Sequence, residues 1–136
     1  MASAIYPKFK EWLISSALGG GATLPAADVR AILVDAQDYT YATSHEFLSD
    51  VPGAARVAAS PTLGSKTFAQ GVFDAADTSF PTVTGDQSEA IIIYVHTGSD
   101  ATARLVAYID SGTGLPVTPS GGNIPVTWNA SGIFAL

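Results

Sequence analysis

The sequence predicts a mostly β domain, an antiparallel β-sandwich or barrel of about eight or nine short strands that follow one N-terminal helix. Two runs carry most of this prediction. Residues 29–36 (VRAILVDA) and 89–96 (EAIIIYVH) are apolar, of strand length and rich in β-branched side chains. Glycine and proline divide much of the remaining chain into segments about 8–12 residues apart, the spacing typical of sandwich strands. With 136 residues and no cysteine, the chain has the size of one domain that folds without disulfides.

The first element is expected to be a helix. Pro7 suits the first helical position, where its missing N–H is no loss, and the glycines at 19–21 end the helix. We therefore treat 1–136 as a single domain, with an N-terminal helix and glycine linker at 1–21 and a β-sandwich at 22–136. An apolar stripe at three- and four-residue spacing supports the helix and consists of Phe9, Trp12, Leu13 and Ala17.

Strands are expected along the rest of the chain, with one short helical turn among them. Thr43 and Glu46 fit a capping box, and Pro52 ends the turn that they begin. The runs 89–96 and 104–110 flank a Thr-Gly-Ser-Asp turn and are expected to form a hairpin at the centre of a sheet. Shorter strands are expected at 55–59, 66–69, 72–75, 80–83, 123–128 and 133–136.

The composition is poor in charge. Charged residues make up 13% of the chain and hydrophobic residues 47%, whereas about 25% of an ordinary soluble domain is charged. Two explanations stay open. A partner or copies of the same chain cover part of the surface, or the surface is rich in Ala, Gly, Ser and Thr, which are neutral without being strongly apolar.

The charge pattern also bears on partners and location. The net charge is −6, and among the six basic residues only Lys8 and Lys10 lie close together, so no nucleic-acid partner is expected. No run of about 18 apolar residues is present, so no membrane partner is expected either. The N-terminal residues do not have the pattern of a signal peptide, and synthesis in a cytoplasm is expected.

No pattern in the sequence indicates catalysis, a cofactor or a metal centre, and we expect none of the three. His45 and His96 lie outside any Gly-x-Ser-x-Gly motif, and we interpret both as structural. The carboxylate pairs flank predicted turns, where Asp commonly binds the local backbone, so the turn interpretation is favoured over a calcium site or a small hydrolase. These pairs are Asp35 with Asp38, Asp74 with Asp77, and Asp86 with Glu89.

Several segments resemble small proteins that are encoded beside the major capsid gene of tailed bacteriophages. The resemblance covers most of the chain, and within that group it is strongest to the capsid cement proteins of short-tailed phages. Its motifs are structural and not chemical. The segments are 5–11 (IYPKFKE), 32–35 (ILVD), 39–41 (YTY), 45–48 (HEFL), 51–57 (VPGAARV), 71–77 (GVFDAAD) and 105–110 (LVAYID).

The resemblance implies a jelly-roll-like sandwich on the outer surface of a phage head, where it would join neighbouring capsomers. The implied partners are the major capsid protein and copies of the chain itself, as a dimer or trimer at capsid symmetry axes. The implied location is the outer surface of the virion, after synthesis in the host cytoplasm. The residues expected to contact partners are Tyr6, Phe9, Tyr39, Tyr41 and His45.

One alternative function stays open, a carbohydrate-binding or host-adhesion module on a similar sandwich. It would need an exposed aromatic platform, for which Tyr39, Tyr41 and Trp128 are the candidates. For Trp12 and Trp128 themselves the sequence favours a place in the core.

Overall fold

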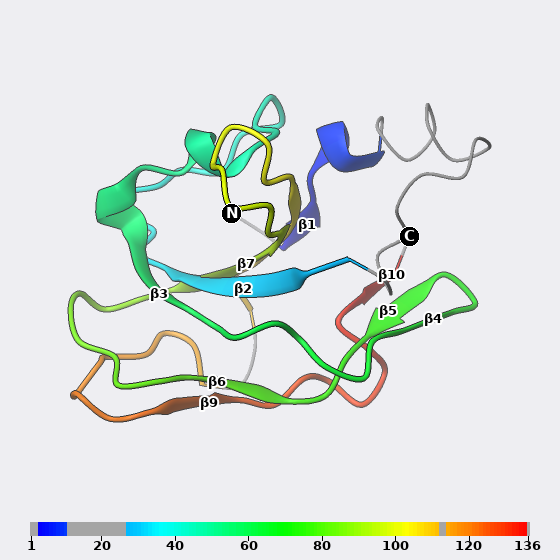
Figure 1. Cartoon of the computed structure of the whole chain (residues 1–136). Helices are drawn as coiled ribbons and strands as arrows, with labels where there is room; N and C mark the ends of the chain where they lie inside the picture. The colour runs from blue at the N-terminus through cyan, green and yellow to red at the C-terminus, as the bar shows by residue number, and fades with distance from the viewer. Residues whose placement is uncertain (1–2, 11–26, 112–113, 136) are drawn as a thin grey trace.

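The computed structural model describes residues 3–10, 27–111 and 114–135 (Figure 1). Residues 7–10 are helical, as predicted for the start of the N-terminal helix. The remainder of that helix and its glycine linker, with Trp12, Leu13 and Ala17, lies outside the described residues, as does the last residue of the predicted strand 133–136.

The larger of the sheets is antiparallel and five-stranded, with the order β1-β8-β7-β2-β3. The register aligns Ile32 of β2 with Ile92 of β7, and Ile92 with Tyr108 of β8. The predicted central hairpin of β7 and β8 is confirmed. In spatial order the strands are β1 (Ala4–Ile5), β8 (Leu105–Ile109), β7 (Ala90–Val95), β2 (Val29–Val34) and β3 (Arg56–Ala59).

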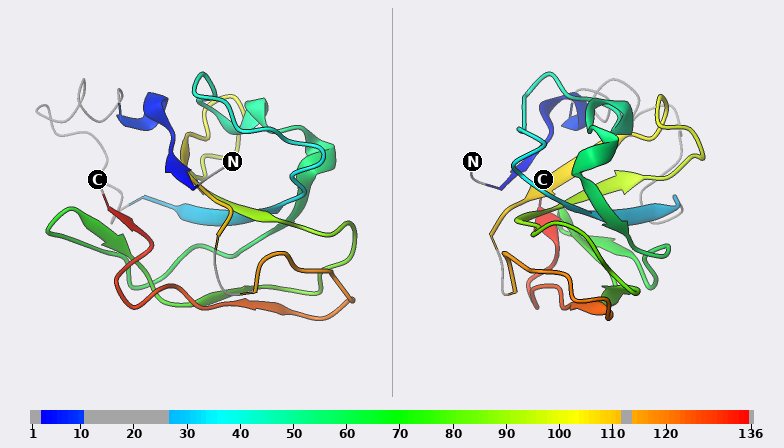
Figure 2. Two further views of the ribbon diagram at one scale, coloured as in Figure 1. Left: turned by 180° about the vertical axis from the view of Figure 1, so that it is seen from behind. Right: turned by 90° about the vertical axis from the view of Figure 1, so that its left-hand side faces the viewer.

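A second layer lies beneath this sheet and is made of two smaller antiparallel sheets (Figures 1 and 2). One sheet has the order β10-β5-β4, and the other pairs β6 with β9. The predicted class, a mostly β antiparallel sandwich with few helices, is confirmed. The strands of this layer are β4 (Thr67–Ala69), β5 (Val72–Asp74), β6 (Thr78–Phe80), β9 (Ile124–Val126) and β10 (Phe134–Ala135).

The five-stranded sheet is covered on both faces, which explains why its central strands are almost continuously apolar. Leu33 and Ile91 lie opposite each other in the register and share a small cavity with Phe80 of the second layer. Tyr108 belongs to the other face, where its ring contacts Tyr39 from the loop after β2. The short 3₁₀ helices η2 (Leu48–Asp50) and η3 (Gly53–Ala55) lie on that same side of the sheet (Figure 1).

Three local features differ from the sequence predictions. The carboxylate of Asp50, and not the side chain of Thr43, accepts hydrogen bonds from the N–H groups of Glu46 and Phe47 (2.7 and 3.1 Å) before η2. Strand β6 ends at Phe80 because Pro81 lacks a backbone donor and Thr82 has a φ of 47°. Strand β1 has only two residues, too few for a periodic pattern to reveal.

Within the described part of the chain, no helix is both long and apolar enough to cross a bilayer.

Candidate functional site

The residues expected to contact partners lie together on the face of the five-stranded sheet that the loop after β2 covers. The ring centroids of Tyr6 and Tyr41 are 5.0 Å apart, and those of Tyr39 and His45 are 5.3 Å apart. The ring of Tyr108 lies 6.1 Å from Tyr39 and 5.6 Å from Tyr41. We call the set Tyr6, Phe9, Tyr39, Tyr41, His45 and Tyr108 the tyrosine cluster.

A chain of side-chain hydrogen bonds runs through the tyrosine cluster. The hydroxyl oxygens of Tyr6 and Tyr39 are 2.7 Å apart, and the Tyr39 hydroxyl is 2.8 Å from Nδ1 of His45. A phenol has one proton to donate and lone pairs to accept with, so Tyr39 can bond both neighbours at once. This hydrogen bond agrees with the interpretation of His45 as a structural histidine, which stays a prediction.

The burial of the cluster corrects part of the sequence prediction. Tyr6 and Phe9 are fully buried and Tyr39 is 3% exposed, so these three rings are not available to a partner in the folded chain. The reason is that an uncovered sheet face at Tyr108 would leave apolar area in water, and these rings cover it. Tyr41 and His45 are only half-buried, and a partner contact through them stays a prediction.

Burial also raises the pKa of the tyrosine hydroxyls. The pKa of Tyr39 rises to about 12, mainly because the ionised phenolate would be desolvated. Desolvation likewise raises the pKa of the four other tyrosines, and it does so most strongly for Tyr6. The folded chain therefore holds its tyrosine protons more tightly than the unfolded chain does.

This difference predicts loss of stability in alkali. A pKa raised in the folded state gives stability that is fully present below the ordinary tyrosine pKa of 10.0 and is lost as the pH rises through about 12. Denaturant unfolding across that range should show a falling free energy of unfolding. Tyrosinate absorbance should rise together with the loss of the near-ultraviolet circular dichroism signal. A tyrosinate midpoint near pH 10.0 in a chain that keeps its native signal would contradict this.

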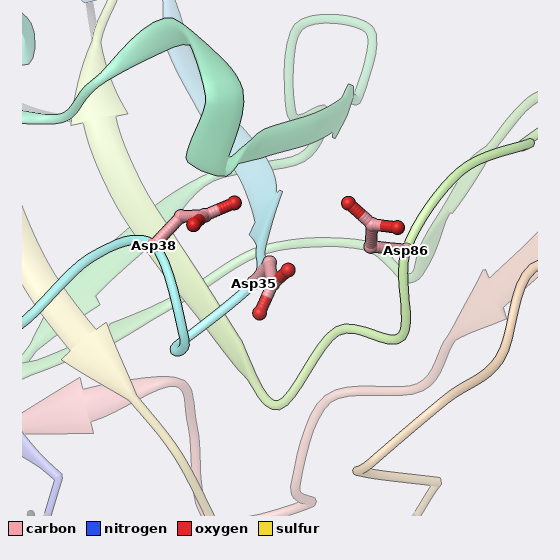
Figure 3. Close-up of side chains that lie close together, drawn as sticks. All are labelled: Asp35, Asp38 and Asp86. Atoms are coloured by element: carbon pink, nitrogen blue, oxygen red, sulfur yellow. The ribbon is translucent and has the colours of Figure 1, made fainter.

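Three carboxylates meet at the end of β2 (Figure 3). One oxygen from each of Asp35, Asp38 and Asp86 lies within 4.8 Å of the others, although Asp86 is distant in sequence. Asp35 is 5% exposed, and its Oδ1 accepts a hydrogen bond from the N–H of Gln37 (2.8 Å), as the turn interpretation predicts. Oxygen donors of this kind suit Ca²⁺, but the hydrogen bond to Gln37 already gives Asp35 a structural role.

The three carboxylates are expected to repel one another. Asp86→Asn should therefore raise the denaturation midpoint slightly at low ionic strength, and added salt should remove most of the gain. Asp100→Asn is the matched comparison and should lower the denaturation midpoint, because the Asp100 carboxylate is paired with Arg56 at 2.7 Å. If Asp86→Asn lowers the midpoint in the absence of divalent ions, repulsion does not dominate at this site.

A groove of about 670 Å³ lies between the two layers, on the side of β1 and β8. Its upper wall includes Ala107 and Ile109 of β8, and its lower wall is formed by the segment from Val126 to the C-terminal strand. Trp128 lies in that segment and is half-buried against the core. Trp128 therefore borders the core and the groove, whereas the sequence favoured the core alone.

The arrangement of the proposed aromatic platform is also corrected. Tyr39 and Tyr41 pack on Tyr108 of β8. Trp128 instead lines the groove together with Ile109, the residue that follows Tyr108 in the strand. Consecutive residues of a strand point to opposite faces of its sheet. The three aromatic residues therefore do not form one surface.

The three arginines of the sequence are all engaged in ion pairs within the fold. Each guanidinium lies 2.7–3.0 Å from a carboxylate oxygen, and that of Arg104 also lies 4.8 Å from the ring centroid of Phe47. These side chains stabilise loops, and none lines the groove. The pairs are Arg30 with Asp28, Arg56 with Asp100, and Arg104 with Glu46.

Comparison of the sequence with protein-family models and with curated proteins found no match.

Proposed function

We propose that the chain is a structural virion protein that binds the outer surface of a bacteriophage capsid and cements neighbouring capsomers. The observation that carries the proposal is that the three arginines and His45 are all bonded to other side chains of the chain itself. The three arginines are in ion pairs, and His45 is bonded to Tyr39. Side chains engaged in this way stabilise a rigid body, which suits a protein that works through its surfaces.

The segments that resemble capsid cement proteins supply the identity of the partner in this proposal. Several of them belong to the main sheet or to its cover: Tyr39, Tyr41 and His45 are members of the tyrosine cluster, and 105–110 includes β8. The low charged fraction of 13% adds support, because a protein covered by its neighbours needs less surface charge. Its net charge of −6 would also limit adhesion to DNA.

The size of the chain is compatible with bridging. The accessible surface of the chain is 6931 Å², and an ordinary interface covers about 800 Å² on each partner. Roughly a tenth of the surface would serve one contact, so one copy can touch two capsomers and a second copy of itself. Capsid symmetry repeats these contacts over the whole head, and a modest contribution per copy becomes large in sum.

Co-sedimentation tests the proposal. Purified protein mixed with expanded heads that lack it should pellet with them and saturate at a fixed ratio to the major capsid protein. Heads that already carry the protein are the control and should take up little more. Failure to bind any expanded head would overturn the proposal. Sedimentation velocity of the isolated chain tests the proposed dimer or trimer separately.

A further inference from the structure

We propose that the groove beneath β1 and β8 binds a stretch of a neutral oligosaccharide, with Trp128 as the stacking surface. The inference does not depend on the capsid role. Its first support is shape, because a concavity of about 670 Å³ falls within the usual size of ligand sites, about 300–1,000 Å³.

The second support is charge. None of the described residues that line the groove is charged, although the chain as a whole carries a net charge of −6. A charged ligand would have to be desolvated there without a counter-ion from these residues, which is costly. The walls therefore favour a ligand that is polar but uncharged.

The third support is the fixed position of Trp128. Its backbone N–H donates to Oδ1 of Asp77 (2.9 Å), and its indole Nε1–H donates to the carbonyl oxygen of Ala76 (3.1 Å). Two bonds from one residue fix the place and the rotation of the ring before any ligand arrives. An aromatic ring held in this way provides contact area at low entropic cost.

The fourth support is the set of polar side chains that line the groove together with Trp128. All are exposed, and their hydroxyl and amide groups can bond more than one partner. Ser3 Oγ already bonds Asp110 Oδ1 and Ser111 Oγ (3.0 and 3.1 Å), and Asn129 Oδ1 accepts from the Ser131 N–H (2.8 Å). A sugar would therefore bond mainly to the Thr127 and Ser131 hydroxyls and the Asn129 amide N–H groups. A sugar presents C–H groups on one face and hydroxyls around its edge, so it matches an aromatic ring with a polar surround. The polar lining residues are Ser3, Ser111, Thr127, Asn129 and Ser131.

An extended apolar peptide is the other occupant that the shape allows, since β1 and β10 are edge strands of their sheets. It would use the sheet edges and leave most of the polar surround without a partner. The surround therefore favours the sugar, and the experiment separates the two.

The test begins with the full chain on an array of neutral and anionic glycans, followed by calorimetric titration with the neutral glycan that binds best. Trp128→Ala should weaken binding roughly tenfold, because ring contact area is lost, and Trp128→Phe should retain most of the affinity. Thr127→Val removes only an exposed hydroxyl and should weaken binding roughly threefold without changing the melting temperature. Thr40→Val, also exposed but outside the groove, is the matched control and should bind as the unchanged protein does.

Several results would overturn the proposal. Binding of anionic glycans alone, or of an extended apolar peptide in place of every neutral glycan, rejects the assigned ligand class. The ligand binds elsewhere if two results occur together. Thr127→Val would bind as tightly as the unchanged protein, and Trp128→Ala would bind as tightly as Trp128→Phe. If Trp128→Ala fails to fold, Thr127→Val and Trp128→Phe still decide. None of these outcomes bears on binding to heads.

Discussion

Gly132→Ala is expected to lower the free energy of unfolding by about 3 kcal/mol. Gly132 has a φ of +109°, which a residue with a Cβ rarely adopts. An added Cβ would also overlap the side chain of Val72 and lie 3.2 Å from the carbonyl oxygen of Phe73. Both belong to β5, so the substitution should force β10 away from its partner strand.

A matched variant separates the backbone strain from the overlap. Gly98 also has a positive φ, +90°, but no atom lies within 4 Å of the Cβ that alanine would add. Gly98→Ala should cost only the strain, about 1 kcal/mol. Denaturant unfolding measures both, and amide exchange at Ile133, whose N–H donates to Phe73 (2.8 Å), reports whether β10 has detached. If the two variants lose the same free energy of unfolding, the overlap with Val72 does not add to the cost of the backbone strain.

Tyr39→Phe is expected to destabilise the fold by about 2 kcal/mol. The variant keeps the ring but removes the hydroxyl that bridges Tyr6 and His45. The Tyr6 hydroxyl, which is fully buried, then loses its hydrogen bond, and the cost of its desolvation is no longer offset. The midpoint of thermal unfolding should fall by roughly 6–10 °C.

Two further variants show whether the hydrogen-bond chain is the cause. Tyr6→Phe should cost less, about 1 kcal/mol, because Tyr39 keeps His45 as a partner. Tyr41→Phe removes the hydroxyl of a half-buried ring for which no side-chain hydrogen bond is found among the described residues, and it should change stability by less than about 0.5 kcal/mol. If Tyr39→Phe loses no more stability than Tyr41→Phe, the hydrogen bonds among Tyr6, Tyr39 and His45 contribute little to the free energy of unfolding.

The strands that the sequence predicted best are those buried on both faces. The runs 29–36 and 89–96 are almost continuously apolar because one sheet face packs on Phe80 and the other lies under Tyr39. Strand β1 could not be predicted in this way, since two residues carry no period. The burial of Tyr39 was also out of reach, because a polar and aromatic loop gives no sign of the sheet face that it will cover.

Among the site residues too, local patterns could be predicted and contacts between distant segments could not. Local carboxylate pairs were visible in the sequence, but Asp86 meets Asp35 only because the register of β2 and β7 places Val34 opposite Ala90. The groove depends on how the C-terminal segment passes beneath β8, which no local pattern encodes. Turn chemistry, by contrast, is local: Asp35 was predicted to bind the backbone of a turn, and its carboxylate accepts a hydrogen bond from the Gln37 N–H.

The most direct test of the proposed capsid role is the disruption temperature of heads that lack the protein, measured as purified chain is added. The temperature is expected to rise with occupancy and to level off at the ratio at which co-sedimentation saturates, because each added copy would stabilise a seam between capsomers. Heads that bind the chain to saturation and still disrupt at their original temperature would show that the chain does not cement capsomers.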